Sequence, residues 1–387
     1  MGLLICCIPT VIEPINHNVY PVYDAAGSNW RHAIGLYPTA QDSKELLFRY
    51  SPIVAASFAP WSLLPLTVGS VLWRLVNAAV FLLGLGWYGR AVLTDTISVS
   101  RRPWLFLLSL LLVGVSIFNG QANALVLGLI LMAVAAVITA RFNFAALVMA
   151  AACLFKGYPI ALGLLLAAAY PRRFAPRFFL VLAIGLVLPF VLQNPRYVSE
   201  QYVHWVDHLH NDNDRAHLGY YGMFRDLRLL TSYVGFEMGY RAYQVVQLVL
   251  GAGIAVFCGI AWRRGIAEST RLHWMVGLSC CWMTVFGPAT ELCTYGLMAP
   301  VIAVPLIESF DRPSHRIRLG LWWTIYALLC IPVVAGWFDW QHSVLVPPMQ
   351  PLATLVLFVC LIAVAARRMV NKSETPSLPQ VTMARAA

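Results

Sequence analysis

Charged residues are scarce in this sequence. Only 11% of its 387 residues are Asp, Glu, Lys or Arg, whereas 60% are apolar, and the mean hydropathy is +0.71. A soluble domain usually has about a quarter of its residues charged, so this composition excludes a water-soluble globular fold. We predict an all-α, polytopic transmembrane bundle, because helices pair their own backbone groups inside the bilayer.

Zinc-site and nucleotide-site motifs are also missing. No two of the nine cysteines have the spacing of a zinc site, and the glycines lack the strand–turn–helix context of a nucleotide loop. We therefore expect no cofactor. His204 and His208, four residues apart beside Asp207, leave a metal interpretation open, because on a helix they would share a face. No third ligand is fixed by spacing, and residues 211–214 are typical of a solvated turn, so we favour a solvated, acceptor-facing loop without metal.

Basic residues are spread along the chain, although the net charge of +10 by itself is compatible with a nucleic-acid partner. They occur in short gaps between apolar runs, which is the positive-inside pattern of a membrane protein and favours that class over a nucleic-acid surface. The clustered arginines are Arg101, Arg102, Arg172, Arg173, Arg177, Arg263, Arg264, Arg312, Arg316, Arg318, Arg367 and Arg368.

Apolar runs predict about 11–12 membrane spans. A hydrocarbon core of about 30 Å needs about 20 helical residues, so the short apolar stub 2–12 is expected to be part of a truncated first span. Eleven runs follow the first loop: 68–88, 104–118, 122–140, 144–155, 158–170, 178–192, 240–262, 274–286, 295–307, 319–337 and 348–366.

The runs and arginines together predict a topology. With a cytoplasmic amino terminus, every arginine cluster lies on the cytoplasmic side. We expect one membrane domain over 1–369, with outer loops 13–51 and 194–239, and a disordered cytoplasmic tail over 370–387. The polar residues outside the arginine clusters then gather on the outer face of the cytoplasmic membrane.

Three local features add to this topology. Lys156 lies between two short runs, so we expect it below the membrane surface, facing a cavity that opens to the outer leaflet. Three prolines in 51–67 predict a short helix along the interface. Arg74 lies within an apolar run, and we expect its side chain to snorkel to the interface.

The first outer loop contains Asp24 among aromatic residues. Apolar residues recur around it at helical spacing, which predicts a short helix with Asp24 near its amino end. Asp24 is then either a helix cap or a catalytic carboxylate.

Several motifs of this sequence, and the order in which they occur, resemble those of glycosyltransferase family 87, the polyprenol-phosphate-mannose-dependent mannosyltransferases of the GT-C membrane fold. The resemblance covers about 18–310. Its motifs are the aromatic-rich 23–37 loop, Arg49-Tyr50-Ser51-Pro52, the run 73–77, Asn119-Gly120-Gln121-Ala122-Asn123 and Lys156-Gly157-Tyr158-Pro159.

The resemblance implies a membrane glycosyltransferase. It would move a hexose, mannose in the first instance, from a polyprenyl-phosphate-linked donor to a glycolipid or glycan acceptor on the outer face of the cytoplasmic membrane. Members place a catalytic carboxylate in the first outer loop as general base, which makes Asp24 the first candidate and Glu13 the reserve. The family's Asp usually precedes a Val-Tyr pair, here Val22-Tyr23, where this chain has Asn18 or Val19.

A lipid-phosphate donor also needs cations where negative charge develops. Lys156, Arg49 and Arg225 are the outer-side cations for the donor phosphate. Relatives often carry a histidine near 291, where this chain has Glu291; we expect it to pair with Arg225 or Lys156, or to orient the acceptor. The candidate substrate contacts are Tyr23, Tyr50, Gln121, Asn123 and Tyr158.

Two other classes of function remain open. A secondary transporter or lipid flippase would show related halves and broken helices at the bilayer midplane, and no repeat is visible here. A catalytically inactive relative of the family would keep the fold without the chemistry, and the displaced Asp and missing histidine keep that alternative open.

Overall fold

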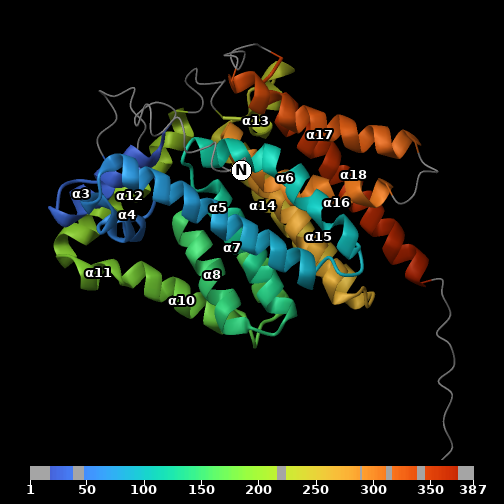
Figure 1. Ribbon diagram of the computed structural model, residues 1–387, viewed down its shortest axis with the longest axis horizontal. Helices are drawn as coiled ribbons and strands as arrows, with labels where there is room; N and C mark the ends of the chain where they lie inside the picture. Colours follow the sequence, from blue (N-terminus) through green and yellow to red (C-terminus); the bar gives the residue numbers. More distant parts are fainter. Residues whose placement is uncertain are drawn as a thin grey trace, which may run out of the picture.

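The computed structural model describes residues 18–37, 48–215, 224–287, 290–310, 316–337 and 345–373. Within these ranges every regular element is a helix, which confirms the all-α prediction (Figure 1). The stub 2–12 and the reserve candidate Glu13 lie outside the described residues.

Seven helical segments within the described ranges are long and apolar enough to cross a membrane. This confirms a polytopic membrane bundle. The segments are α5 (Leu66–Ala91), η2 (Val99–Arg101) with α6 (Arg102–Phe118), α10 (Ala175–Val187) with α11 (Pro189–Leu192), α14 (Tyr240–Arg263), η4 (Leu292–Met298) with α16 (Ala299–Phe310), α17 (Arg316–Trp337) and α18 (Met349–Ser373).

The other four apolar runs also form helices, but shorter or more polar ones. These are α7 (Asn123–Ile138), α8 (Phe142–Phe155), α9 (Ile160–Ala169) and α15 (Glu268–Cys281), which continues as the π-helical turn η3 (Trp282–Phe286). Each of the eleven runs after the first loop is thus helical, whereas length and composition support a crossing for seven of them. At 1.5 Å per residue, α7 is about 24 Å long, less than the hydrocarbon thickness of about 30 Å.

Glycines allow α7 to pack directly against α5 in the core. A Cβ built on Gly128 of α7 would lie 2.5 Å from the carbonyl oxygen of Val80 in α5, and one on Gly84 would collide with the backbone of Gly128. Most of α7 is buried by its neighbours, so it forms the centre of the bundle (Figure 1). Close approach of backbones at small residues is the usual way in which membrane helices pack.

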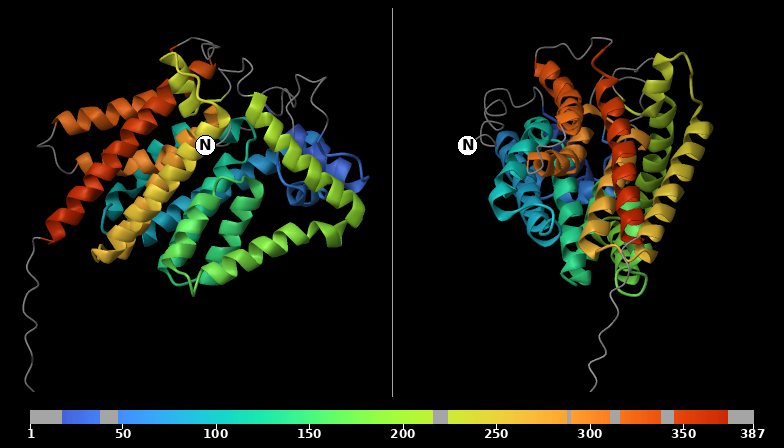
Figure 2. Two further views of the ribbon diagram at one scale, coloured as in Figure 1. Left: turned by 180° about the vertical axis from the view of Figure 1, so that it is seen from behind. Right: turned by 90° about the vertical axis from the view of Figure 1, so that its right-hand side faces the viewer.

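A separate group of helices covers one end of the bundle: α3 (Tyr20–Arg31), α4 (Pro52–Phe58), the turn η1 (Trp61–Leu63) and α12 (Pro195–Arg215). Helices α10 and α11 run along the outside and lead back to α12 beside α3 and α4 (Figure 1, Figure 2). The Gln201 side chain accepts a bond from the Leu36 backbone at 2.8 Å, and the Tyr197 hydroxyl donates to the Ile34 carbonyl at 2.7 Å. The helices expected near Asp24 and in 51–67 are therefore present.

Three local predictions need correction. Asp24 is the fifth residue of α3 and does not cap it; the Asn18 side chain accepts from the Tyr20 backbone at 3.0 Å instead. Residues 211–214 continue α12 rather than forming a turn. Arg74 does not snorkel: it is 1% exposed, and its guanidinium donates to the Phe118 carbonyl at 2.8 Å, at the end of α6.

The carboxyl-terminal boundary is also later than expected. Helix α18 runs to Ser373, so residues 370–373 are helical, while the rest of the expected tail lies outside the described residues.

We expect Gly128→Ala to destabilise the bundle, because the new methyl group meets the backbone of α5. The cost should be about 1–2 kcal/mol after the better helix propensity of alanine is taken into account, measured as a lower thermal midpoint of the detergent-solubilised protein. Gly253→Ala in α14 is the control, since its Cβ meets nothing within 4 Å. Equal midpoints for both variants would contradict the packing argument.

Candidate functional site

Glu291 holds together two distant parts of the chain. It directly precedes η4, and its carboxylate accepts from the Arg49 guanidinium at 3.1 Å and from the Gln121 amide at 3.1 Å, one bond to each oxygen. The expected ion pair is therefore formed with Arg49, rather than with Arg225 or Lys156. The side chains of Arg49 and Glu291 keep 29% and 27% of their surface exposed, so the pair can be reached from solvent.

A relay of two amides connects Glu291 to Lys156. The Gln121 oxygen accepts from the Asn123 amide at 2.7 Å, and the Asn123 oxygen accepts from the Lys156 ammonium at 2.7 Å and the Tyr158 hydroxyl at 3.1 Å. Because each amide uses its oxygen on one side and its nitrogen on the other, the orientation of both is fixed. We call Arg49, Glu291, Gln121, Asn123, Lys156 and Tyr158 the polar network.

Local backbone structure brings these side chains to one end of the bundle. Gly120 has φ of +64°, which allows the sharp turn from α6 into α7, and its carbonyl accepts from the Trp73 indole at 2.8 Å. Lys156 ends α8 with an extended backbone, and Pro159 starts the turn into α9. The network therefore lies where α6 and α8 end and where α7 and α9 begin.

The aromatic residues of the first loop lie beside the network. Tyr23 and Tyr50 share a hydroxyl–hydroxyl hydrogen bond of 2.5 Å, and the Tyr37 hydroxyl donates to the Tyr50 carbonyl at 2.6 Å. Tyr23 also packs on Trp73, with ring centroids 5.4 Å apart. Tyr23, Tyr37 and Trp73 are buried, whereas Tyr50 keeps part of its surface exposed.

The cation Arg225 is buried near the network without an acidic partner among the described residues. It is 3% exposed, its guanidinium donates to the Gln350 amide oxygen at 3.0 Å, and its backbone nitrogen donates to the Thr290 carbonyl at 2.6 Å. Burial lowers the pKa of Arg225 to about 10. Asp226, the next residue, caps α13 (Leu227–Tyr233) and pairs with Arg228 at 3.7 Å.

Asp24 lies on a different face of α3 from Tyr23. Its electrostatic neighbours are Tyr20 and Arg31, and one of its carboxylate oxygens is buried without a hydrogen-bond partner among the described residues. Burial raises the pKa of the Asp24 carboxyl, and the Arg31 guanidinium lowers it in part. The structure thus brings together Glu291, the cations and the polar candidates, but no described contact joins Asp24 to them.

The chain matches the family model of glycosyltransferase family 87 over residues 48–288, more than half of its length. It belongs to glycosyltransferase family 87. No curated protein matches the chain. Membership in family 87, together with the seven apolar helices, indicates a multi-pass membrane glycosyltransferase.

The matched region of this family 87 member contains most of the polar network. Arg49, Gln121, Asn123 and Lys156 lie within it, whereas Glu291 lies three residues beyond its end. Residues that the sequence did not single out also support the site: Gln350 holds Arg225, and the Trp205 indole donates to the Arg49 carbonyl at 3.2 Å. Both partners are more than 100 residues away from the residue they hold, so no local pattern identifies them.

The histidines of α12 do not form a metal site with three ligands among the described residues, where no group of three His, Cys, Asp or Glu side chains could hold an ion. His204 is exposed, while His208 is buried against Tyr37, with ring centroids 6.0 Å apart. The two side chains therefore have different environments, although they are on one helix.

A double-mutant cycle should reveal the coupling of Asn123 to Lys156. Asn123→Ala leaves the half-buried ammonium without its carbonyl acceptor, which should lower the unfolding free energy by about 1–3 kcal/mol. Lys156→Met removes the charge. In the Lys156→Met background, Asn123→Ala should therefore lower the unfolding free energy by at least about 0.5 kcal/mol less than it does in the wild type. Thermal or denaturant unfolding in detergent measures both, and strict additivity would contradict the contact.

Proposed function

We propose that this family 87 protein transfers a hexose, with mannose as the first candidate, from a polyprenyl-phosphate-linked donor to a glycolipid or glycan acceptor. The transfer takes place on the outer face of the cytoplasmic membrane, on a fold of the GT-C type. The observation that carries this proposal is the polar network, in which one accessible carboxylate is held between cations at one end of the membrane helices.

The chemistry requires both kinds of charge. An acceptor hydroxyl attacks the anomeric carbon, the bond from that carbon to the phosphate oxygen breaks, and polyprenyl phosphate leaves with one more negative charge than the donor phosphodiester had. Cations that face the leaving oxygens lower the barrier to this step. Lys156, Arg49 and the buried Arg225 are the groups we assign to the phosphate, because Arg225 lacks a described acidic partner.

Glu291 is our first choice for the general base. Each of its oxygens already accepts one bond, from Arg49 or Gln121, and keeps a further lone pair for an acceptor hydroxyl. A base must lie within hydrogen-bond reach of the proton that it removes, and Glu291 is the carboxylate next to the cations. Asp24 is the alternative base. In our assignment its α3 helix positions the buried Tyr23, whose hydroxyl donates to the Tyr50 hydroxyl, and Tyr50 and Tyr158 bind the sugar.

The orientation of the site follows from the arginine clusters. The network lies at the end of α6 and α8 and at the start of α9, whereas Arg101 precedes α6 and Arg173 follows α9. Under the positive-inside rule the arginine end is cytoplasmic, so the network end faces outward. A lipid-linked donor is compatible with that face, because its phosphate lies at the membrane surface while its chain stays in the bilayer.

Glu291→Gln should lower sugar transfer by about 10²–10⁴-fold, since the amide keeps the size of the side chain and cannot accept the proton. The assay follows transfer from polyprenyl-phosphate-mannose in membranes that contain the full chain. Asp24→Asn should retain activity within about tenfold, and Glu200→Gln on the exposed side of α12 is the control.

The opposite result, with Asp24→Asn inactive and Glu291→Gln active, would identify Asp24 of α3 as the general base. If the wild-type protein transfers no sugar from any polyprenyl-phosphate donor, the proposed reaction is wrong and the inactive-relative alternative is favoured.

As the pH rises, activity should fall at a lower pH than the usual pKa of a lysine would predict. Burial lowers the pKa of Lys156, and the Glu291 carboxylate raises it in part, so the ammonium loses its proton below the usual lysine pKa of about 10.4. A profile of kcat/KM against pH measures this limb, and Lys156→Arg should move it to higher pH. An unchanged limb in Lys156→Arg would show that another group titrates there.

A further inference from the structure

One side chain connects the carboxyl-terminal helices α17 and α18 to the cation Arg225. Gln350, in the first turn of α18, is 0% exposed, and its amide oxygen accepts from the Arg225 guanidinium at 3.0 Å. Its amide nitrogen donates to the Leu329 carbonyl of α17 at 3.2 Å. Because its oxygen and its nitrogen are both used, the orientation of the Gln350 amide is fixed. The family match ends before either helix begins.

The backbone of Arg225 is held on both sides by the segment that leads into η4. Its nitrogen donates to the Thr290 carbonyl at 2.6 Å, and its carbonyl accepts from the Tyr295 hydroxyl at 2.5 Å. The thiol of Cys293, within the same segment, has both Lys156 and Arg225 as electrostatic neighbours. Arg225 is therefore anchored beside the polar network.

The guanidinium of Arg225 has donors to spare. Within the part of the chain that the structure describes, its one hydrogen bond goes to Gln350, and its Nε is buried without a partner. An arginine side chain has several N–H donors, and burying them without acceptors is costly. A ligand with several acceptor oxygens, such as a phosphate, would satisfy them.

The partner of Arg225 differs in charge from the partner of its neighbour Arg228. Arg228 pairs with the carboxylate of Asp226 at 3.7 Å, which compensates its charge. Gln350 is neutral, so it orients the Arg225 guanidinium and cancels none of its charge. A carboxylate in the same place would accept the same hydrogen bond, but it would compete with an anionic ligand for the arginine.

We propose that Gln350 is a positioning residue for sugar transfer, which orients Arg225 as a neutral acceptor and leaves its full positive charge to the phosphate of the polyprenyl donor. This inference rests on the proposed function, in which Arg225 is assigned to that phosphate. Gln350 acts through Arg225 and needs no contact with the donor. The site then depends on the helices α17 and α18, which lie outside the matched region of the family.

Two substitutions of Gln350 separate this role from a purely structural one. Gln350→Met removes both hydrogen bonds and adds no charge, whereas Gln350→Glu keeps the acceptor for Arg225 and gives it an acidic partner. If Gln350 only ties α18 to Arg225, the methionine variant is the more damaged one. If Gln350 preserves the charge of Arg225 for a phosphate, the glutamate variant is.

Binding of farnesyl phosphate, a short polyprenyl phosphate, to the full chain in detergent measures the effect without catalysis. Gln350→Glu should weaken binding by at least about tenfold, as expected for the loss of a hydrogen bond between charged groups, and Gln350→Met by a smaller factor. Farnesol, which has no phosphate, should bind the wild type and both variants equally. In the Arg225→Met background, Gln350→Met should have no further effect. The kcat/KM for polyprenyl-phosphate-mannose should fall in the same order.

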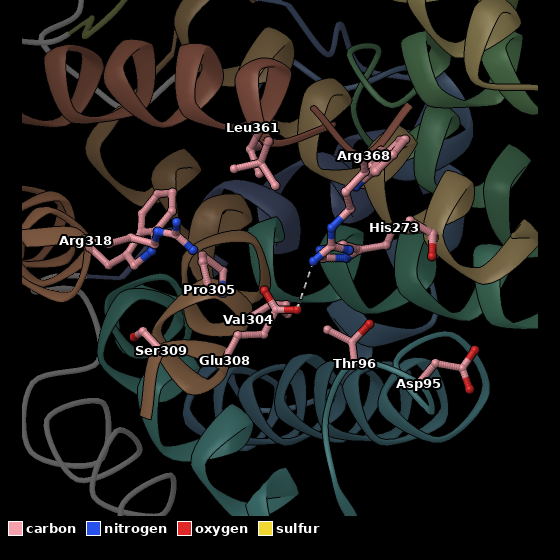
Figure 3. A pocket seen from close by; sticks show the side chains of 14 residues that line it. Asp95, Thr96, His273, Val304, Pro305, Glu308, Ser309, Arg318, Leu361 and Arg368 are labelled. Atoms are coloured by element: carbon pink, nitrogen blue, oxygen red, sulfur yellow. Dashed lines mark hydrogen bonds and ion pairs between the residues drawn. The ribbon is translucent and has the colours of Figure 1, made fainter. Parts of the chain in front are cut away.

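Arg368→Gln is the control near the other end of α18. Arg368 lies about 27 Å from Gln350 along the helix and lines a cavity of about 460 Å³, where its guanidinium donates to the Glu308 carboxylate at 3.4 Å (Figure 3). The cavity shares no residue with the polar network or with Arg225. This variant should bind farnesyl phosphate as tightly as the wild type does.

A larger loss of farnesyl phosphate binding in Gln350→Met than in Gln350→Glu would overturn the inference, as would an equal loss of farnesol binding. If the wild type transfers sugar and Gln350→Glu is fully active, this inference fails and the proposed function stands. If the wild type transfers none while farnesyl phosphate binding follows the expected order, the proposed function fails and the role of Gln350 stands. Circular dichroism checks the folding of each variant. Should Gln350→Glu not fold, the dependence of the Gln350→Met effect on Arg225 decides.

Discussion

The ammonium of Lys156 is the constraint around which the end of the bundle that holds the polar network is organised. A charge at the edge of the bilayer costs several kcal/mol unless polar groups replace its water. Asn123 provides the first of these groups, and Gln121 passes the interaction on to Glu291. Three segments far apart in sequence are thereby fixed relative to one another by one chain of hydrogen bonds.

This chain of bonds also explains the backbone around it. Helix α7 starts at Asn123, so the amide of that residue points out of the first turn of the helix toward Lys156. The turn before it needs Gly120 in the left-handed region, and Trp73 and Arg74 of α5 bind the carbonyls on either side of that turn. Arg74 therefore supports the site from within the core, which accounts for its burial in a span.

The helices were predictable because they depend on local composition. Each apolar run in the part of the chain that the structure describes is a helix, since a single apolar segment in a bilayer pairs its backbone groups most simply in that way. The members of the network were predictable for a related reason: polar residues between apolar runs must meet at helix ends. Lys156 was identified in this way, whereas Gln121 was identified from the family resemblance.

Pairing was not predictable, because it depends on contacts between distant segments. Glu291 was expected to pair with Arg225 or Lys156, yet Arg49, 242 residues away, is its partner. Arg74 was expected at the interface, and no local pattern reveals that the Phe118 carbonyl at the end of α6 accepts two bonds from its guanidinium. The α12 helix continues through residues whose composition resembles a turn.

The position at which the family resemblance predicts a carboxylate has a structural role in this chain. Asn18, which stands near that position, is 4% exposed; its oxygen accepts from the backbone of Tyr20 and its nitrogen donates to Ser70 at 2.9 Å. Asn18 is neutral, so the carboxylate of the polar network is supplied by Glu291.

The formal charges of the described site then favour its proposed ligand. Arg49, Lys156 and Arg225 contribute three positive charges, and Glu291 contributes one negative charge. In the proposed mechanism Glu291 takes the acceptor proton as the bond to phosphate breaks, so the net charge of these four groups rises from +2 to +3 while the phosphate goes from one negative charge to two. Under our proposal the leaving group is stabilised more strongly than the donor diester, which carries a single negative charge, and this difference is the proposed source of the rate acceleration.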